Sequence, residues 1–333
     1  MKWLIVGLGS IGRRHLKNLA ALGQTDITLF RTHHSTLPDD ELAPYPVATS
    51  FAAALADKPD AVIIANPTGL HLDAAIPAAE AGCHLLLEKP VAAKLDQRVN
   101  VLKRAVDQAG VATLVGFQFR FHPVLEKLKA ALDGGVIGRP LTFRAHWGEY
   151  LPGWHPWEDY RQSYAARSDL GGGVVNTLSH PLDYVRWLFG EVDSLYALTG
   201  QVSDLDVDVE DLAEITLTFE SGVVGSVHLD YYQQPPAHWL EITGTQGQVR
   251  WDNGTGIARI YTAHEDRWEN IEPPLGFGRN DLFLAEMRHF LSVIIDEAPS
   301  RCSLEDGIKS LVLTTAVHES ARMGIKVEIP HLT

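Results

Sequence analysis

The sequence predicts an α/β protein with two domains, the first built on a parallel sheet and the second on an open, mostly antiparallel sheet. Three observations support this fold class. Short, continuously apolar runs alternate with helical patterns over the first ~118 residues, a glycine-rich turn follows the first run, and apolar and polar side chains alternate from about residue 210. Strands buried on both faces appear as continuous apolar runs, whereas strands with one wet face alternate.

The first domain takes its elements in strand–helix order. Strands are predicted at Trp3–Val6, Ile27–Phe30, Ala61–Ala65, Leu85–Leu87 and Ala112–Phe117. Helices are predicted at Arg13–Leu22, Leu70–Ala81 and Leu95–Ala109. Breakers such as Asn66-Pro67 stand where turns are needed. We place this domain at residues 1–119.

The second domain, residues 120–333, begins with a helical segment at Val124–Leu132 and the strand-like LTFRAHWGEY. A long loop rich in Trp, Pro and Tyr follows, and then the alternating runs of an antiparallel sheet. Helical patterns at Asp281–Asp296 and Ser303–Met323 complete the prediction.

Bulk properties narrow the class of protein. The 333 residues are 45% hydrophobic and carry a net charge of −14, which argues against a nucleic-acid or anionic-membrane surface. Cys83 and Cys302 lack the spacing of a zinc site, and no apolar run approaches the ~20 residues that span a bilayer. We therefore expect a cytoplasmic protein without a catalytic metal.

The glycine turn predicts a dinucleotide site. The strand Trp3–Val6 leads directly into Gly7-x-Gly9-x-x-Gly12, with Ser10 and Ile11 inside the motif, and a helix follows. Such glycines allow a tight turn, a close approach to a pyrophosphate and close packing of helix on strand. The helix N-terminus adds amides and a positive potential for the phosphates. The first domain is therefore predicted to be a Rossmann domain.

The end of the second strand bears on the choice of cofactor. An NAD site usually carries an acidic residue there, but this strand continues as Arg31-Thr32-His33-His34-Ser35. Arg31, helped by Thr32 or Ser35, is suited to hold a 2′-phosphate. A solvated Arg31 with a water-bridged ribose is the alternative. We expect NADP to be preferred, with NAD possible.

The segment GGGVVNTLSHPLD, residues 171–183, offers a proton acceptor in His180. Apolar side chains recur at helical spacing up to Phe189, so the helix is expected to end at Gly190. Because Pro181 has no N–H to donate, the helix is expected to begin near Ser179 or His180. The positive end of that helix favours a neutral imidazole. The segment alone is equally typical of a structural histidine at a helix start.

These motifs together resemble the Gfo/Idh/MocA oxidoreductase family, which includes glucose–fructose oxidoreductase and inositol dehydrogenase. The resemblance rests on GLGSIGRRH, IANPTGLH (Ile64–His71), LLLEKPVA (Leu85–Ala92) and the GGG…H..D segment. It implies oxidation or reduction at a hydroxyl-bearing carbon of a sugar, cyclitol or sugar nucleotide. It also implies a second domain whose sheet serves in oligomer contacts, as in a homodimer or homotetramer.

The resemblance assigns roles to single residues. Lys89 matches a lysine near the nicotinamide and the substrate hydroxyl, and His180 matches the family's histidine; both are expected to be catalytic. The expected cofactor-binding residues of these motifs are Asn66, Pro67, His71, Glu88 and Lys89, and the bond from Lys89 to Pro90 is frequently cis in the family. Asp183 matches the acid after the histidine.

One position departs from the family pattern. The family usually places an aspartate shortly before the histidine, and this chain has Asn176 and Thr177 there. Neither side chain accepts a proton as a carboxylate does. We expect His180 to be the base and Asn176 or Thr177 to bind another substrate hydroxyl, with Asp183 alongside.

The expected substrate side also includes Arg120 and three residues of the long loop, Trp157, Tyr160 and Arg161. Arginines suit phosphates or carboxylates, and aromatic rings give flat faces for sugars. Alternatively, Arg120 is ion-paired at the domain junction and the aromatics pack in the core or an oligomer contact.

The leading hypothesis is an NAD(P)-dependent sugar or cyclitol dehydrogenase or reductase. Two alternatives of the same fold stay open, namely a glycosidase that uses its cofactor transiently and a non-catalytic dinucleotide sensor. The presence of both Lys89 and His180 counts against the sensor.

Overall fold

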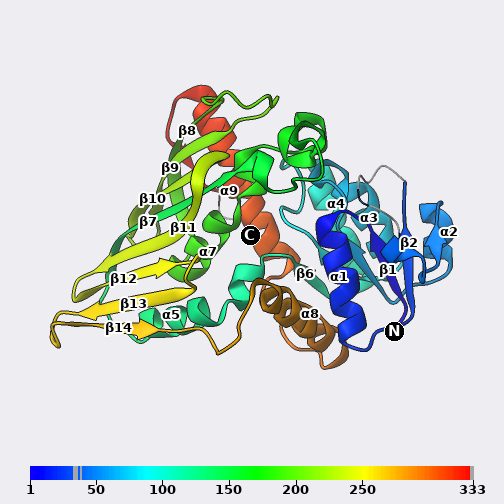
Figure 1. Ribbon diagram of the computed structural model, residues 1–333, viewed down its shortest axis with the longest axis horizontal. Coiled ribbons are helices and arrows are strands. Elements are labelled where there is room, and N and C mark those ends of the chain that lie inside the picture. Colours follow the sequence, from blue (N-terminus) through cyan, green and yellow to red (C-terminus); the bar gives the residue numbers. More distant parts are fainter. Residues whose placement is uncertain (33–36, 38–39, 331–333) are drawn as a thin grey trace. The chain divides into compact units, whose positions relative to one another are not determined.

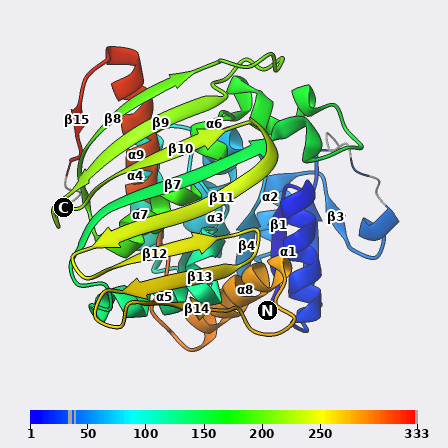
Figure 2. The ribbon, with the colours of Figure 1, turned by 60° about the vertical axis from the view of Figure 1, so that its left-hand side comes forward.

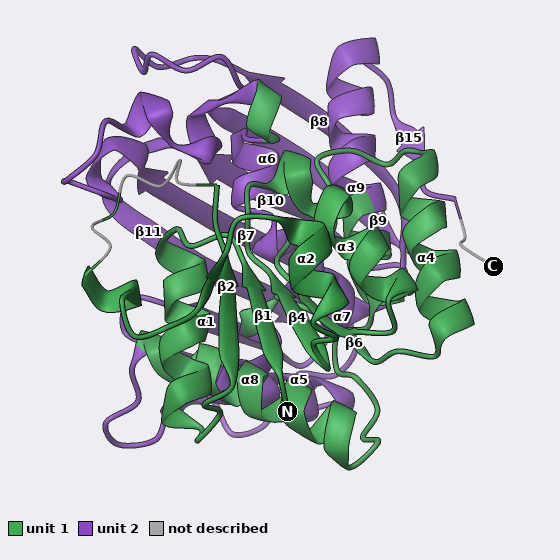
Figure 3. Cartoon of the chain, turned by 90° about the vertical axis from the view of Figure 1, so that its right-hand side faces the viewer, with its two compact units in different colours: residues 1–118, 169–171, 279–311 green, residues 119–168, 172–278, 312–333 purple. Residues whose placement is uncertain are grey.

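A computed structural model describes residues 1–32, 37 and 40–330. The described chain forms two compact units (Figure 3). The first unit contains Met1–Gln118, Asp169–Gly171 and Arg279–Leu311, and the second contains Phe119–Ser168, Gly172–Gly278 and Val312–Thr333. The chain thus first leaves the first unit after Gln118 and later returns to it twice.

The first unit is built on a six-stranded parallel sheet of order β3-β2-β1-β4-β5-β6. Figure 1 labels its strands β1, β2 and β6. Its strands are β1 (Trp3–Val6), β2 (Ile27–Phe30), β3 (Val47–Ala48), β4 (Ala61–Ile64), β5 (His84–Leu87) and β6 (Thr113–Val115). Every residue of β1 and β4 is buried, which explains why these strands appear as unbroken apolar runs. The sequence analysis missed only the two-residue β3 among the described strands of this sheet.

The helices of the first unit are α1 (Ser10–Ala21), α2 (Phe51–Ala56), α3 (His71–Glu80), α4 (Gln97–Ala109) and α8 (Arg279–Ile295). Helices α3 and α4 pack together, and α8 packs against α1. Helix α4 begins two residues later than predicted because Asp96 caps it, accepting a hydrogen bond from the backbone N–H of Arg98. Helix α9 (Leu304–Met323) begins in the first unit and ends in the second.

The second unit is built on a nine-stranded sheet of order β14-β13-β12-β11-β7-β10-β9-β8-β15. Its strands are β7 (Pro140–Tyr150), β8 (Val192–Gly200), β9 (Leu212–Phe219), β10 (Val224–Asp230), β11 (Tyr232–Gly244), β12 (Gly247–Asp252), β13 (Ile257–Thr262), β14 (Arg267–Ile271) and β15 (Val327–Glu328). Neighbouring strands are antiparallel except β7 and β10, which are parallel. The predicted fold class is confirmed.

One face of this sheet carries the core of the second unit. Helices α5 (Pro123–Asp133), α6 (Val174–Thr177) and α7 (His180–Phe189) contact it on that side, and Figure 2 shows the strands in front of α5 and α7. Along β7, Phe143 and Ala145 are buried in this core, while Thr142 and Arg144 are exposed on the other face. The alternation predicted from sequence therefore separates a packed face from an open face.

None of the helices in the described ranges is long and apolar enough to cross a membrane.

Candidate functional site

The glycine turn between β1 and α1 fits an anionic ligand. Gly7 has φ +89°, and a Cβ there would lie 2.4 Å from the backbone N of Asn66; a Cβ on Gly12 would lie 1.9 Å from the carbonyl O of Gly7. At Gly9, by contrast, a Cβ would meet no atom within 4 Å. Gly9 is the N-cap of α1, and the first turn of the helix carries no acid. The turn thus leaves space beside helix amides, as a pyrophosphate requires.

The other residues predicted to bind the cofactor here are Ser10 and Ile11 of the glycine motif and the residues that follow β2. Ser10 is exposed and Ile11 is half-buried. The backbone N–H of Arg31 donates to the carbonyl O of Ala48 at 3.2 Å, and Arg31 is buried while Thr32 is exposed. Ser35 lies outside the described residues.

His71 joins two of the predicted motifs. One of its ring nitrogens, Nδ1, lies 2.9 Å from the carbonyl O of Pro90, and the other, Nε2, lies 2.9 Å from the carbonyl O of Asn66. Burial lowers the pKa of His71. The imidazole therefore holds the Asn66-Pro67 turn against the segment that follows Lys89.

Glu88 directly follows β5, and its buried carboxylate contacts His15 and the backbone of Lys89. Its Oε1 lies 2.7 Å from Nε2 of His15 in α1, and its Oε2 accepts the backbone N–H of Lys89 at 3.2 Å. A Cβ on Gly116 would approach that carboxylate to 3.0 Å. Burial opposes ionisation, but the hydrogen bond to His15 and the charges of His15 and Lys89 hold the pKa of Glu88 below its usual value. The bond from Lys89 to Pro90 is cis.

In the second unit, His180 begins α7 with Ser179 as N-cap, and the helix ends at Gly190 with φ +93°. Both helix ends agree with the prediction from Pro181 and Gly190. The ring of His180 is buried, with its centroid 5.1 Å from that of Phe119 and 5.5 Å from that of Trp147. Aromatic neighbours therefore fix the orientation of this imidazole.

Asn176 and Thr177 lie in α6 and are both buried. Asn176 Nδ2 donates to the carbonyl O of Gly172 at 3.5 Å. A carboxyl group is nevertheless present at this turn, because Glu210 accepts the backbone N–H of Val175 at 3.2 Å. Burial raises the pKa of Glu210. The sequence analysis missed Glu210, which comes from a different part of the chain.

The carboxylate of Asp183 forms an ion pair with Arg120. The Nε of Arg120 donates to Oδ2 of Asp183 at 2.9 Å, and Nη2 donates to Oδ1 at 2.8 Å. Both side chains are buried. Of the two alternatives for Arg120, the structure contains the ion pair, and its partner is an internal carboxylate.

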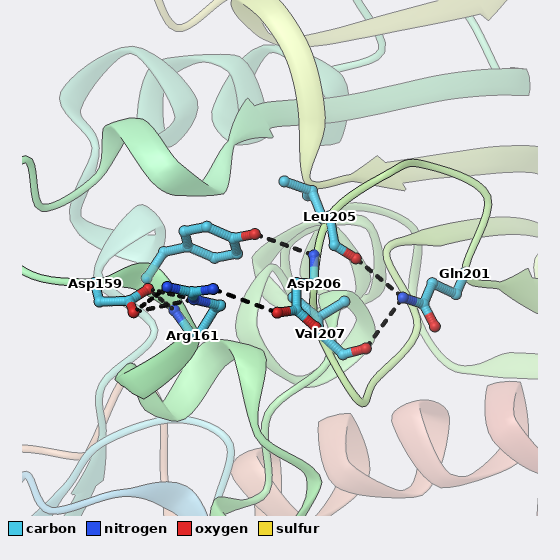
Figure 4. Close-up of polar contacts among 7 residues, drawn as sticks. Asp159, Arg161, Gln201, Leu205, Asp206 and Val207 are labelled. Atoms are coloured by element: carbon cyan, nitrogen blue, oxygen red, sulfur yellow. Dashed lines mark hydrogen bonds and ion pairs between the residues drawn. The ribbon is translucent and has the colours of Figure 1, made fainter.

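The loop residues Tyr160 and Arg161 both contact Asp206. Figure 4 shows Arg161 between Asp159 and Asp206. Arg161 makes a bidentate contact with Asp159, at 2.9 and 2.7 Å, and its Nη1 lies 3.5 Å from Oδ2 of Asp206. The hydroxyl of Tyr160 accepts the backbone N–H of Asp206 at 3.0 Å. Trp157 is 60% exposed and presents its ring to solvent.

The predicted residues fall into two sets. The first unit contains the glycine turn, Arg31, the Asn66–His71 segment and the Glu88–Pro90 segment, and His71 brings the last two together. The second unit contains Arg120, Trp157, Tyr160, Arg161, Asn176, Thr177, His180 and Asp183. Within that set, the structure pairs Arg120 with Asp183 and leaves the loop residues in a separate cluster.

The open face of the large sheet holds one further polar group. Within the part of the chain that the structure describes, His146, His228 and Asp230 are the group whose possible metal-ligating atoms all lie within 4.8 Å of one another. However, Nδ1 of His228 faces Glu214 at 2.5 Å and Nε2 faces Asp230 at 3.0 Å. Donation from both nitrogens describes an imidazolium, which has no lone pair for a metal.

A shallow hollow of 590 Å³ also lies on this face, over strands β11 to β14. Its lining includes Trp239, Glu241, Arg250, Asp252 and Arg259. None of the residues predicted for cofactor or substrate belongs to it.

An open glycine turn at a helix N-terminus, at the carboxyl end of an interior strand of a parallel sheet, defines the class of dinucleotide-binding Rossmann proteins. Residues 1–117 match the oxidoreductase family with an NAD-binding Rossmann fold, and residues 125–250 match the Gfo/Idh/MocA C-terminal domain. The chain belongs to the Gfo/Idh/MocA oxidoreductase family. Its resemblance to that family, inferred from the motifs, is confirmed.

Two similar proteins are named as dehydrogenases of a sugar derivative and of a cyclitol. Levoglucosan dehydrogenase of Pseudarthrobacter phenanthrenivorans is 27% identical, with 86% of this chain and 84% of the relative covered. Myo-inositol 2-dehydrogenase of Thermotoga maritima is 27% identical, with 97% and 98% covered. A solved levoglucosan dehydrogenase, in complex with NADH and levoglucosan, shares the fold with a TM-score of 0.88 at 22% identity, with 99% and 100% covered.

Proposed function

We propose that this protein is an NADP-preferring dehydrogenase or reductase acting on a hydroxyl-bearing carbon of a sugar, cyclitol or sugar derivative. The observation that carries the proposal is the arrangement at the edge of the parallel sheet. There His15 and His71 hold the Glu88–Pro90 segment to the helix and turn that flank the open Gly9. Family membership and the dehydrogenases among its relatives support the same reaction class.

In this proposal the nicotinamide, when bound, exchanges a hydride with the substrate carbon. His180 takes the hydroxyl proton, since a neutral imidazole nitrogen accepts a proton and this ring is oriented by Phe119 and Trp147. Lys89 places a positive charge where alkoxide character develops. Asn176 or Thr177 hydrogen-bonds another hydroxyl, and the exposed Trp157 offers a face for a sugar ring.

The experiment that tests this function follows nicotinamide absorbance with a panel of sugars, cyclitols, uronates and nucleotide sugars. NAD and NADP are offered separately, and His180→Ala serves as the comparison. Turnover with a member of the panel, reduced about 10²- to 10⁴-fold in the variant, is the expected result. Tight cofactor binding with cleavage of a glycoside and no net redox change would instead point to the glycosidase.

The preference for NADP rests on Arg31 and on the absence of an acid at Arg31-Thr32. We predict that Arg31→Ala lowers kcat/KM with NADP about 10- to 100-fold, as expected for the loss of one charged hydrogen bond, and changes kcat/KM with NAD little. Steady-state kinetics with both cofactors measure this. Equal use of NAD and NADP by the unaltered protein would contradict the preference.

We also propose that the chain forms a homodimer or homotetramer through the open face of the nine-stranded sheet. Tyr196, Leu198 and Val224 support this, because they are large apolar side chains exposed on β8 and β10. Exposed apolar surface of this kind is typical of a contact between proteins.

A further inference from the structure

Glu286 is an acid buried inside the first unit. It lies on α8, on the apolar face formed by Leu282, Phe283, Met287 and Phe290. None of its surface is exposed, and neither carboxyl oxygen has a hydrogen-bond partner among the described residues. A buried carboxyl without partners is costly, so its presence on an apolar face calls for a role.

The carboxyl of Glu88 points to that role, because His15, which contacts Glu88, lies edge-on to Phe283 of α8 with ring centroids 6.3 Å apart. Glu286 lies close enough to Glu88 for the two carboxyls to repel each other, and burial together with Glu88 raises the pKa of Glu286 well above its usual value. Glu88 already interacts with His15 and with the backbone N–H of Lys89. Two carboxyls in a dry interior do not both ionise, and these contacts assign the negative charge to Glu88.

We propose that Glu286 is a positioning residue, a neutral acid whose O–H dipole is directed toward Glu88 and so keeps Glu88 the anionic partner of Lys89. No direct bond joins the two carboxyls among the described contacts, and Nδ1 of His15 also has no partner there. The neutral carboxyl of Glu286 therefore acts on Glu88 through its dipole and not through a direct bond. The inference rests on the proposed function, because that function makes Lys89 a catalytic residue.

Other ionisable groups lie around Glu88 on the elements packed against it. His15 and Arg14 come from α1, Lys89 follows β5, and His71 begins α3. Arg279 acts on Arg14 from the start of α8. Of these groups, His15 and Lys89 favour an ionised Glu88 through their hydrogen bond and their charges.

The test compares Glu286→Gln, Glu286→Leu and the control Met287→Leu, which changes a fully buried neighbour on the same helix without touching the acid. Glutamine keeps a neutral donor, whereas leucine removes it. We expect Glu286→Gln and Met287→Leu to keep the unaltered pH profile of kcat. In Glu286→Leu the pKa of Glu88 rises, so the acid limb moves up by about one pH unit and kcat measured on that limb, below the pKa of Glu88, falls about tenfold. Identical pH profiles for Glu286→Leu and Glu286→Gln would overturn the proposal.

Two measurements decide the matter without any substrate. Infrared spectroscopy of the unaltered protein at about pH 8 should show the carbonyl band of a protonated buried carboxyl that Glu286→Gln lacks, and absence of the band overturns the proposal. The pH dependence of NADH binding should shift in Glu286→Leu alone, and an unshifted curve counts against a link to Lys89. Neither measurement needs turnover, so a panel in which no substrate reacts would count against the proposed function and leave the test of Glu286 intact.

Discussion

Arg120 and Asp183 form the buried ion pair on which the region around His180 depends most directly. Both side chains are almost fully buried and the contact is bidentate. Removing one partner from such a pair leaves an uncompensated buried charge, which typically costs about 3–5 kcal/mol. The aspartate also stands in the first turn of α7, three residues after His180.

We predict that Asp183→Asn lowers the free energy of unfolding by about 3 kcal/mol or more, measured by urea denaturation. The control is Asp133→Asn, whose carboxylate pairs with Lys129 on the surface and is worth less than about 1 kcal/mol. The double variant Arg120→Met/Asp183→Leu should recover much of the loss. Equal effects of the two single variants would contradict this account of the pair.

Single residues also show which features of the structure were predictable from the sequence and which were not. Pro181 and Gly190 act within their own helix, so the ends of α7 were predictable from local backbone rules. Arg120 and Asp183 are 63 residues apart, and their pairing depends on how strands and helices pack. Glu286 did leave a sequence signal, namely an acid within the apolar stripe of a helix, but only the packing of α8 on α1 shows what it faces.

At the scale of elements, strands β11, β7 and β10 align three rings on the open face of their sheet. Trp239 pairs with His146 and His146 with His228 in register, and the rings stack with centroids 5.2 and 4.5 Å apart. Glu214 of β9 and Asp230 of β10 hold the nitrogens of His228. The hydrogen bond to Asp230, followed by that to Glu214, raises the pKa of His228 against the opposing effect of burial.

This cluster should make stability depend on pH. Because the pKa of His228 is higher in the folded than in the unfolded protein, its contribution is fully present below the unfolded value of about 6.5 and is lost as the pH rises through the folded value. We predict that His228→Gln lowers the free energy of unfolding more at about pH 5.5 than at about pH 8.5, as measured by urea denaturation. A loss of the same size at both pH values would contradict a protonated His228.

For the whole molecule, continuous apolar runs predicted the parallel sheet and alternation of apolar and polar residues predicted the second sheet, because each pattern depends on which faces of a strand are buried. It did not predict that Arg279–Leu311 packs with the first unit, since that depends on contacts between distant segments. The same limit applies to Glu210, which supplies a carboxyl to the turn before His180 from another segment.

The proposed oligomer is tested at this scale too. We predict that Leu198→Arg weakens self-association about hundredfold or more, because a leucine lost from a symmetric contact counts twice. Leu275→Arg, at a fully exposed position after β14, should leave it unchanged. Sedimentation over a range of concentrations measures both. A monomeric unaltered protein, or an unchanged Leu198→Arg variant, would refute the sheet as the interface.

The most direct measurement for the central claim follows the hydrogen on the reacting carbon. A substrate identified from the panel is deuterated at that carbon, and the reduced nicotinamide is analysed by mass spectrometry for the unaltered protein and for His180→Ala. The account predicts one deuterium per cofactor reduced, with the rate about 10²- to 10⁴-fold lower in the variant. Consumption of the substrate without deuterium in the cofactor, or an unchanged rate in His180→Ala, would contradict it.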